Sequence, residues 1–406
     1  MSSPPLVLAR FQILNGLASN FTYPQTCVPR VRSIQHTCQY RYKCESAMMS
    51  QAAPFELQMP NPQRAAHALQ ALVCCLAVAA MLCLHPFRAQ AQPASAAATA
   101  ESVAPIITPA ALKVLIDKKA NLRILDIREL MQGDGKTPNY DAGHIPGAIA
   151  APYSSIRGPE KNPGRILSDQ ELSQLFRKWG IDTQAHIVIA PVGSDASDFG
   201  GAARLFWTLH LAGLKRISIL EGGLGAWGAL GYPIETTKNT PAASGISVKL
   251  DRTQIATTNE IAGLIRNRAS GKKFLLSDSR TEDYFLGEDK HPSSPRAGTL
   301  PGAKNHDHEE WFQLNTSKLL PRDQLESIAK NAGLIGDQEV ITFCNTGHWS
   351  ATTWFVLTQL LGQRNIKLYP ESTVSWSKSR NPMDNEPSRA SVLKQQLKDS
   401  VDNLKR

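Results

Sequence analysis

Between residues 105 and 385, short apolar runs alternate with segments in which apolar residues recur every three or four positions. The runs predict buried strands and the segments predict helices, in an order typical of a mostly parallel sheet. Ser168 followed by Glu171 is a capping box, which predicts the start of one helix. We expect strands at 122–127, 186–192, 217–222, 273–278, 339–344 and 366–369. We expect helices at 108–119, 168–180, 200–213, 257–267, 322–332 and 349–361.

Two short motifs occur twice, in the same order and at nearly the same offset. Asp141-Ala-Gly-His-Ile-Pro-Gly-Ala148 returns as Arg296-Ala-Gly-Thr-Leu-Pro-Gly-Ala303, and Leu125-Asp-Ile-Arg128 returns as Ser277-Asp-Ser-Arg280. The period is a whole domain, which indicates a duplicated α/β unit rather than a solenoid. The sequence therefore predicts domains at 105–237 and 253–385, a linker near 236–252 and a C-terminal tail at 386–406.

The N-terminal region has the composition of a targeting sequence. Residues 68–84 are almost entirely apolar, Arg64 precedes them, and Ala89-Gln-Ala91 follows as a cleavage motif. This layout predicts a signal peptide over 59–91 and a periplasmic or secreted protein with no stable membrane span after cleavage. A short membrane anchor is the alternative. We interpret residues 1–58 as a non-native or untranslated extension, with a transit peptide as the competing reading, and 92–104 as a flexible tether.

Composition narrows the class of protein further. The chain is 42% hydrophobic, which excludes a mostly disordered protein. Its net charge is +9, but residues 1–91 contribute five of those charges, and the nearly balanced remainder gives no reason to expect nucleic-acid binding. Six of the seven cysteines also precede residue 92. Cys344 stands alone in the body, so no intrachain disulfide can form there.

Cys344 carries the strongest chemical signal. It ends a predicted strand, and Asn345, Thr346, Gly347, His348 and Trp349 follow it before an apolar helix. In parallel α/β folds ligands bind beyond the carboxyl ends of strands, where a helix start stabilises anions and a thiolate becomes a nucleophile. The alternative is a buried, inert structural cysteine.

Several polar residues near this segment are further candidates. His348 could donate a proton, in which case activity would fall above pH 6.5, its ordinary pKa. Arg296 and Arg280 are the cations that could bind an anionic substrate, although Arg280 could instead pair with Asp278 as a structural residue. Trp349 either walls the pocket or packs the helix. His306, Asp307 and His308 resemble metal ligands only by composition, and we predict no metal and no cofactor.

Taken together, these motifs resemble those of tandem-domain rhodaneses, a sulfurtransferase family. The segment 344–349 matches the family's six-residue catalytic loop in length and place, and 141–148, 296–303 and 220–227 resemble its flanking motifs. The resemblance implies two rhodanese-like domains, each a mostly parallel sheet flanked by helices. The corresponding segment of the first unit, 190–195, has no cysteine, so the resemblance implies a structural first domain and a catalytic second one.

The resemblance also implies a reaction. Cys344 would take a sulfane sulfur from a small donor such as thiosulfate or mercaptopyruvate and pass it, as a persulfide, to a thiol or other thiophilic acceptor. Phosphatases of this fold need an Arg at the position of Ser350, and no Lys or Arg lies within 344–353. The loop lacks the residues typical of thiosulfate or mercaptopyruvate enzymes, and Tyr284 replaces the family's substrate-binding Arg. A non-enzymatic sulfur carrier or partner-binding module is therefore the alternative, and the oligomeric state is not predicted.

Overall fold

The computed structural model describes residues 103–129, 139–388 and 390, all within one compact unit spanning 95–406. The predicted extension, the signal peptide, nearly all of the tether and most of the C-terminal tail lie outside these residues. No helix in the described part of the chain is long and apolar enough to cross a membrane.

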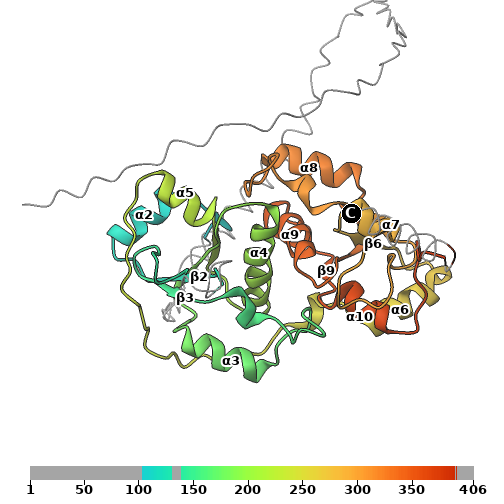
Figure 1. Cartoon of the computed structure of the whole chain (residues 1–406), viewed down its shortest axis with the longest axis horizontal. Coiled ribbons are helices and arrows are strands. Elements are labelled where there is room, and N and C mark those ends of the chain that lie inside the picture. Colours follow the sequence, from blue (N-terminus) through green and yellow to red (C-terminus); the bar gives the residue numbers. More distant parts are fainter. Residues whose placement is uncertain (1–102, 130–138, 389, 391–406) are drawn as a thin grey trace, which may run out of the picture. The chain divides into compact units, whose positions relative to one another are not determined.

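The first domain is built on a five-stranded sheet in the order β1-β5-β4-β2-β3, and every strand pair is parallel (Figure 1). Its strands are β1 (Ile106–Ile107), β2 (Leu122–Asp126), β3 (Ala148–Ala150), β4 (His186–Ala190) and β5 (Ile217–Leu220). Its helices are α2 (Pro109–Asp117), α3 (Asp169–Lys178), α4 (Ala196–Leu211) and α5 (Gly223–Ala229), with a 3₁₀ turn at Tyr153–Ile156.

The second domain repeats this plan with a four-stranded parallel sheet in the order β7-β6-β8-β9. Its strands are β6 (Phe274–Asp278), β7 (Lys304–Asn305), β8 (Glu339–Phe343) and β9 (Ile366–Leu368). Its helices are α6 (Thr258–Arg266), α7 (Glu282–Leu286), α8 (Arg322–Asn331), α9 (Trp349–Phe355) and α10 (Ser372–Lys378), and α9 continues as a π-helix over Val356–Leu360. The predicted α/β class with two mostly parallel sheets is confirmed.

All twelve predicted elements are present, and the differences lie mainly at their ends. Helix α4 begins at Ala196 rather than residue 200, because Asp195 caps it by accepting from the Asp198 N–H. Ser168 caps α3 in the predicted capping box with Glu171. The sequence missed the edge strands β1, β3 and β7, each of two or three residues, and the short helices α5, α7 and α10. Such short elements carry too little periodicity to detect.

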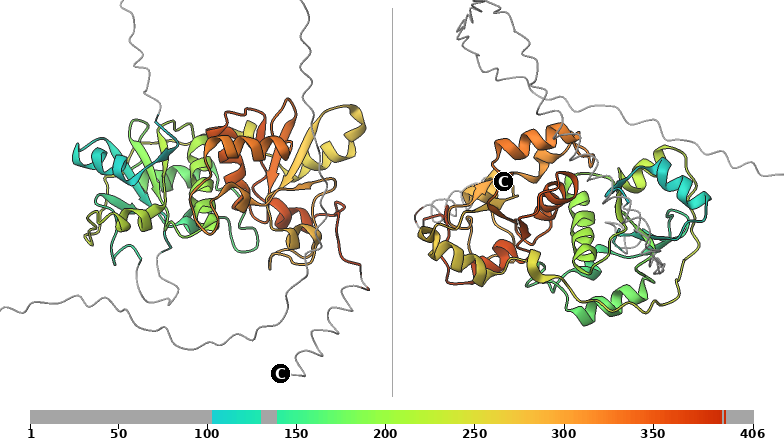
Figure 2. Two further views of the ribbon diagram at one scale, coloured as in Figure 1. Left: turned by 90° about the horizontal axis from the view of Figure 1, so that it is seen from above. Right: turned by 180° about the vertical axis from the view of Figure 1, so that it is seen from behind.

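Each sheet is covered by helices on both faces. In the first domain α2 and α5 pack on one face, around Leu112 and Trp227, while α3 and α4 pack on the other. In the second domain α6 and α10 cover one face, and α8 and α9 cover the other. Helices α4 and α9 lie side by side between the sheets, and their apolar residues form one core with α3 and α8 (Figures 1 and 2). This shared core places the first domain directly against the segment that follows Cys344.

The duplicated motifs perform the same structural task in both domains. In the first, the Arg128 guanidinium donates to the Asp126 carboxylate at 2.6 Å and to the Gly143 carbonyl at 2.7 Å. In the second, Arg280 donates to Asp278 at 2.6 Å and to the Gly298 carbonyl at 3.0 Å. The repeat therefore ties the end of a central strand to the following Ala-Gly turn.

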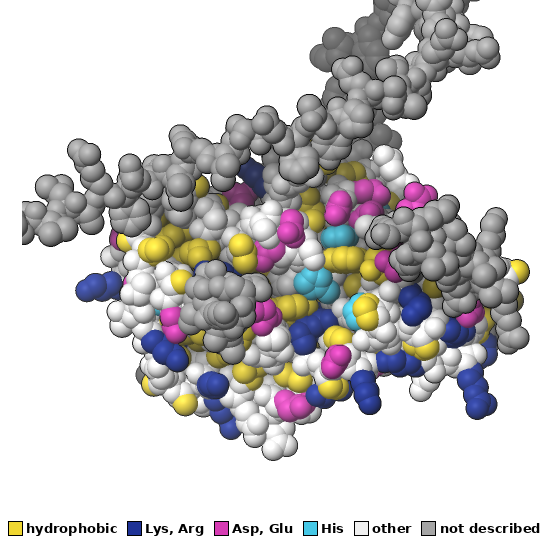
Figure 3. Space-filling view, in the orientation of Figure 1, with side chains coloured by type: hydrophobic (Ala, Val, Ile, Leu, Met, Phe, Trp, Pro, Cys, Tyr) yellow, Lys and Arg dark blue, Asp and Glu magenta, His cyan; other side chains and the backbone are white. Residues whose placement is uncertain are grey.

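The segment 236–252 connects the two domains while packing against the first. Val248 and Leu250 are buried in the shared core, and the Val248 N–H donates to the Ser173 hydroxyl at 2.9 Å. The linker therefore packs against the first domain through buried apolar side chains. On the face drawn in Figure 3, acidic and basic side chains are interspersed, and histidines lie near its middle.

Candidate active site

Cys344 follows strand β8 directly and is only 1% exposed. The residues 344–349, which we call the Cys344 loop, are held from one side by the start of α10. The Ser372 hydroxyl accepts from the backbone N–H of Cys344 at 3.1 Å and from that of Gly347 at 3.2 Å, and it donates to the Tyr369 carbonyl. One side chain thus ties both parts of the loop together. The Ser350 hydroxyl donates to the Cys344 sulfur at 3.5 Å.

Ser372 has a left-handed backbone, with φ of 49°. This conformation is unfavourable for a residue with a side chain, by about 1 kcal/mol or more, and such strain concentrates at functional sites. The corresponding residue of the first domain is Gly223, with φ of 55°, since the N–H groups that follow each of them bind the equivalent loop carbonyls. The second domain therefore places a hydroxyl where the first has no side chain.

The same comparison shows why the first domain lacks a nucleophile. The carbonyls of Pro191 and Val192 accept from the residues after Gly223, as those of Cys344 and Asn345 accept after Ser372, so Pro191 takes the place of Cys344. The Asp198 carboxylate accepts from the N–H groups of Val192 and Gly193 at 3.2 and 2.6 Å. In the first domain, the backbone N–H groups of the equivalent loop therefore already bind a carboxylate of the protein itself.

His348 is held between the two domains. Its Nδ1 lies 2.8 Å from the Tyr153 hydroxyl, and its Nε2 lies 3.2 Å from the Ser197 hydroxyl. Ser197 also accepts from the indole N–H of Trp349 at 3.0 Å. The ring is thus fixed by the first domain, between the 3₁₀ turn at 153–156 and the start of α4.

The charge state of His348 corrects the expectation that it titrates near pH 6.5. Burial, followed by the nearby Arg157 charge, lowers the pKa of His348 to about 3. The imidazole is therefore neutral at the pH values where thiolates form. The neutral ring donates one hydrogen bond and accepts one, and its titration cannot make activity fall above pH 6.5.

This pKa predicts a specific pH dependence of stability. Unfolded His348 takes up a proton below about pH 6.5 while the folded ring stays neutral to about 3, so stability is lost as pH falls through this window. We expect His348→Gln to remove up to about 1.4 kcal/mol per pH unit of that loss. Urea unfolding of both proteins between about pH 4.5 and 7.5 measures it. Identical slopes would contradict a His348 that stays neutral in the folded protein.

Trp349 lies at the junction of three segments. The His308 ring stacks on it with centroids 4.5 Å apart, and the Tyr284 ring meets its edge at 6.1 Å. The indole is therefore held by two aromatic rings and by the Ser197 hydroxyl. Tyr284 therefore lies beside the Cys344 loop.

The two predicted substrate-binding arginines are held by protein groups. Arg280 is fully buried, binds both carboxylate oxygens of Asp278, and reaches the Asn345 side-chain oxygen at 3.4 Å. Arg296 donates to the carbonyls of Ser377, Ser379 and Asn381, each at 2.9 Å. The contacts of Arg280 correspond to its structural alternative, the pairing with Asp278. The substrate-binding role of Arg296 stays a prediction, although its donors already bind three backbone carbonyls.

The histidines of 306–308 are packing residues in this structure. His306 stacks on Trp311 with centroids 4.5 Å apart, and His308 stacks on Trp349. Among the residues that the structure describes, no group of three or more His, Cys, Asp or Glu side chains is arranged to hold a metal ion.

Sequence reasoning missed the residues that the first domain contributes. Tyr153, Arg157, Ser197 and Arg204 all contact the Cys344 loop across the domain boundary. They come from the 3₁₀ turn, from the residue just after it and from α4, and no local motif marks them. Only the packing of α4 on α9 brings them to the loop.

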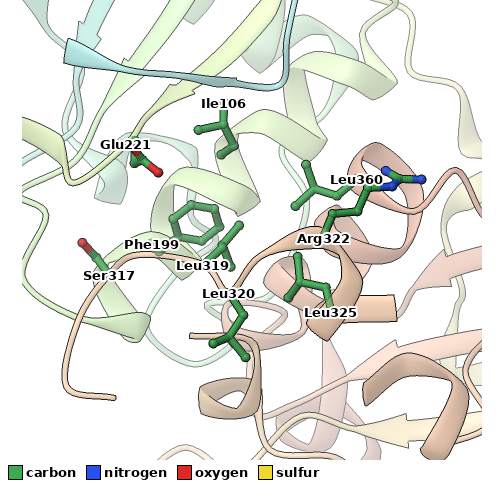
Figure 4. Close-up of a pocket in the computed structure, with 9 residues that line it drawn as sticks. All are labelled: Ile106, Phe199, Glu221, Ser317, Leu319, Leu320, Arg322, Leu325 and Leu360. Atoms are coloured by element: carbon green, nitrogen blue, oxygen red, sulfur yellow. The ribbon is translucent and has the colours of Figure 1, made fainter. Parts of the chain in front are cut away.

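A separate pocket of about 250 Å³ lies between the first domain and the segment around α8 (Figure 4). It contains no residue of the Cys344 loop. Phe199 of α4 lies in its wall and also packs against Phe312 and Phe355. Its lining is mostly apolar: Ile106, Phe199, Glu221, Ser317, Leu319, Leu320, Arg322, Leu325 and Leu360.

Comparisons with known proteins agree with this architecture. The rhodanese-like domain family matches twice, at residues 108–230 and 262–379. A Synechococcus elongatus protein named "Putative thiosulfate sulfurtransferase" is 29% identical over 310 residues, which are 73% of this chain and 89% of that protein. The "Thiosulfate sulfurtransferase" of Azotobacter vinelandii is 28% identical over 240 residues, 58% of this chain and 83% of the relative.

A solved structure shares the fold. The anaerobic ergothioneine biosynthesis enzyme from Chlorobium limicola, in complex with trimethyl histidine, matches with a TM-score of 0.58 and 19% identity over 69% of each chain. The family match covers more than half of the chain and falls on both of the α/β domains described above. The chain therefore belongs to the rhodanese family, as a sulfurtransferase with two rhodanese-like domains.

Proposed function

We propose that this protein transfers a sulfane sulfur from an anionic donor to a thiophilic acceptor through a persulfide on Cys344. One observation carries the proposal: Cys344 is the one cysteine among the described residues, and it lies in a loop closed by Ser372 at the carboxyl end of the central strand β8. In the first domain, Pro191 stands at the position of Cys344, and the Asp198 carboxylate binds the loop that follows it.

The chemistry balances without a cofactor. The Cys344 thiolate attacks the outer sulfur of thiosulfate, the sulfur–sulfur bond breaks, and its electron pair leaves with sulfite. With mercaptopyruvate the carbon–sulfur bond breaks instead, and the electron pair leaves as the pyruvate enolate, which takes up a proton. An acceptor thiolate or cyanide then attacks the outer sulfur of the persulfide and regenerates the Cys344 thiolate. The Ser350 hydroxyl, 3.5 Å from the sulfur, supports an anion there.

The names of two relatives support thiosulfate as the donor. The proteins from Synechococcus elongatus and Azotobacter vinelandii are both named for it, and both align across the two domains. The 1% exposure of Cys344 also favours a small molecule over a protein partner. These two observations place the enzyme ahead of the sulfur-carrier alternative.

The test is sulfur loading followed by turnover. The full-length protein is incubated with thiosulfate, mercaptopyruvate or buffer, and the mass of each peptide is measured. We expect one added sulfur on the peptide containing Cys344, release of sulfite, and repeated turnover when a small thiophile is supplied. Loading without turnover by any small acceptor would favour the carrier, and no loading with any donor would overturn the proposal.

We also propose that the protein works outside the cytoplasm, because residues 64–91 have the layout of a secretory signal. N-terminal sequencing of the mature protein from its native host tests this. A mature chain that begins near residue 92 supports export, and one that begins well upstream of residue 89 contradicts it.

A further inference from the structure

The Cys344 loop has no cation of its own, yet two arginines of the first domain donate to its carbonyls. Arg157 donates to Thr346, and Arg204 donates to Thr346 and Gly347. Arg204 belongs to α4 and is only 1% exposed. Arg157 follows the 3₁₀ turn that also carries Tyr153.

Arg204 is buried against the loop. It donates to the carbonyls of Gly347 at 2.9 Å and Thr346 at 3.4 Å, and to that of Gly164 at 3.0 Å. Its Nε is buried and has no hydrogen-bond partner among the described residues. Burial, and after it the charge of Arg157, lowers the pKa of Arg204 to about 9.

Arg157 also donates to the Thr346 carbonyl. Its Nη2 donates to the Thr346 carbonyl at 3.1 Å, and its guanidinium lies 5.2 Å from the centre of the Tyr153 ring. Its Nη1 is buried and, within the described part of the chain, has no partner. Its charge also acts on His348, after burial, in lowering the pKa of that ring. Arg157 therefore lies within electrostatic reach of the loop and of Arg204.

These two cations lack the carboxylates that pair with the arginines of the repeat. Arg128 is paired with Asp126 and Arg280 with Asp278, each at 2.6 Å. Across the described residues, neither Arg157 nor Arg204 has a carboxylate within ion-pair distance, and each retains a buried N–H without a partner. An unpaired buried charge is unfavourable, so an anion that enters here would relieve a cost that the buried Arg204 already carries.

We propose that Arg157 and Arg204 form an anion site, supplied by the first domain, for sulfur oxyanions such as thiosulfate and sulfite. Arg157, with its free buried Nη1, binds the oxygen end of the donor. Arg204 acts through the carbonyls of Thr346 and Gly347, as a positioning residue that polarises the loop. This inference rests on the proposed function, and it gives the first domain, which lacks a nucleophile, a direct part in the reaction.

The first experiment compares charged and neutral reagents at the same sulfur. In full-length Arg157→Gln we expect single-turnover persulfide formation with thiosulfate to slow by about 10- to 150-fold, the range for one charge-assisted contact. With a neutral dialkyl trisulfide, attack by Cys344 at a terminal sulfur forms a mixed disulfide while an alkyl persulfide anion leaves, and we expect the rate of this adduct formation to change less than about 3-fold. Equal losses toward both donors, or no loss toward thiosulfate, would overturn the anion site.

Alkylation separates this inference from the proposed function, because it needs no sulfur transfer. Iodoacetate and iodoacetamide differ mainly in charge, and their relative rates at Cys344 are read by peptide mass. We expect Arg157→Gln to lower the iodoacetate rate relative to the iodoacetamide rate, and sulfite to protect Cys344 only in the unaltered protein. An unchanged ratio would overturn the anion site even if sulfur loading succeeds, and a changed ratio supports it even if loading fails.

A matched control is Arg252→Gln. Arg252 is also a first-domain-facing cation, but its side chain is 61% exposed and pairs with Asp169 at 3.0 Å. We expect this variant to leave the thiosulfate rate and the alkylation ratio unchanged. If it lowers them as much as Arg157→Gln does, the effect is one of overall charge and the site is contradicted.

Arg204 is tested by restoring its charge. Arg204→Lys keeps a cation while losing the fork of donors, and Arg204→Gln loses both. We expect Arg204→Lys to retain more of the thiosulfate rate than Arg204→Gln when the two melt at similar temperatures. Equal thiosulfate rates in the two variants would show that Arg204 is structural only.

Discussion

Replacing Cys344 with serine is expected to abolish persulfide formation and to lower sulfur transfer by about 10⁴-fold or more. A serine hydroxyl is not ionised near neutral pH and cannot hold a sulfane sulfur. The side chain is buried and Ser is nearly the same size, so the fold should persist. Sulfite release from thiosulfate and the mass of the peptide containing residue 344 together measure the loss.

Ser350→Ala is the matched control for this variant. It removes the hydroxyl that lies 3.5 Å from the Cys344 sulfur but leaves the nucleophile in place. We expect the rate of sulfur transfer to fall about 10-fold, as for the loss of one modest hydrogen bond.

Six other cysteines lie between residues 27 and 83, so peptide mapping must locate the added sulfur. Sulfur transfer by Cys344→Ser at the unaltered rate would show that Cys344 is not the nucleophile.

Gly347→Ala is expected to destabilise the second domain by about 2–4 kcal/mol and to slow persulfide formation at least about 10-fold. Gly347 has φ of 67°, which disfavours any side chain. An added methyl group would also collide with the Arg204 guanidinium and with the Pro370 backbone. The loop would have to open on the side where the first domain holds it. Urea unfolding and single-turnover loading measure the two effects.

Gly362→Ala separates backbone strain from collision. Gly362 has φ of 72°, close to that of Gly347, but an added methyl group there meets nothing within 4 Å. We expect it to cost about 1 kcal/mol and to leave persulfide formation unchanged. Equal effects from the two glycines would mean that the contacts behind the Cys344 loop are unimportant.

Periodicity along the chain was sufficient for most of the fold. Buried strands such as β4 and β8 are short, mostly apolar runs, and helix α3 carries a complete capping box, so local sequence determines both kinds of element. The edge strands were missed because two or three residues, such as β7 at Lys304–Asn305, have no period to detect. Their pairing depends on the neighbouring strand.

Only the part of the candidate site formed by the Cys344 loop was predictable from the sequence. Cys344 and its loop could be found because strand, cysteine, glycine and helix follow one another directly. Arg157 and Arg204 could not, because they precede Cys344 by well over a hundred residues and reach it only through the packing of α4 on α9. Arg296, by contrast, is the first residue of a duplicated motif, but its N–H groups donate to the carbonyls of Ser377, Ser379 and Asn381.

The Asp198 carboxylate has a consequence for redesign. It already occupies the N–H groups of Val192 and Gly193, so a cysteine introduced by Pro191→Cys would compete with a resident negative charge. A thiolate beside that carboxylate is repelled by it. Giving the first domain a catalytic cysteine therefore requires two substitutions made together. One introduces a thiol at Pro191, and the other removes the Asp198 carboxylate that binds the loop N–H groups.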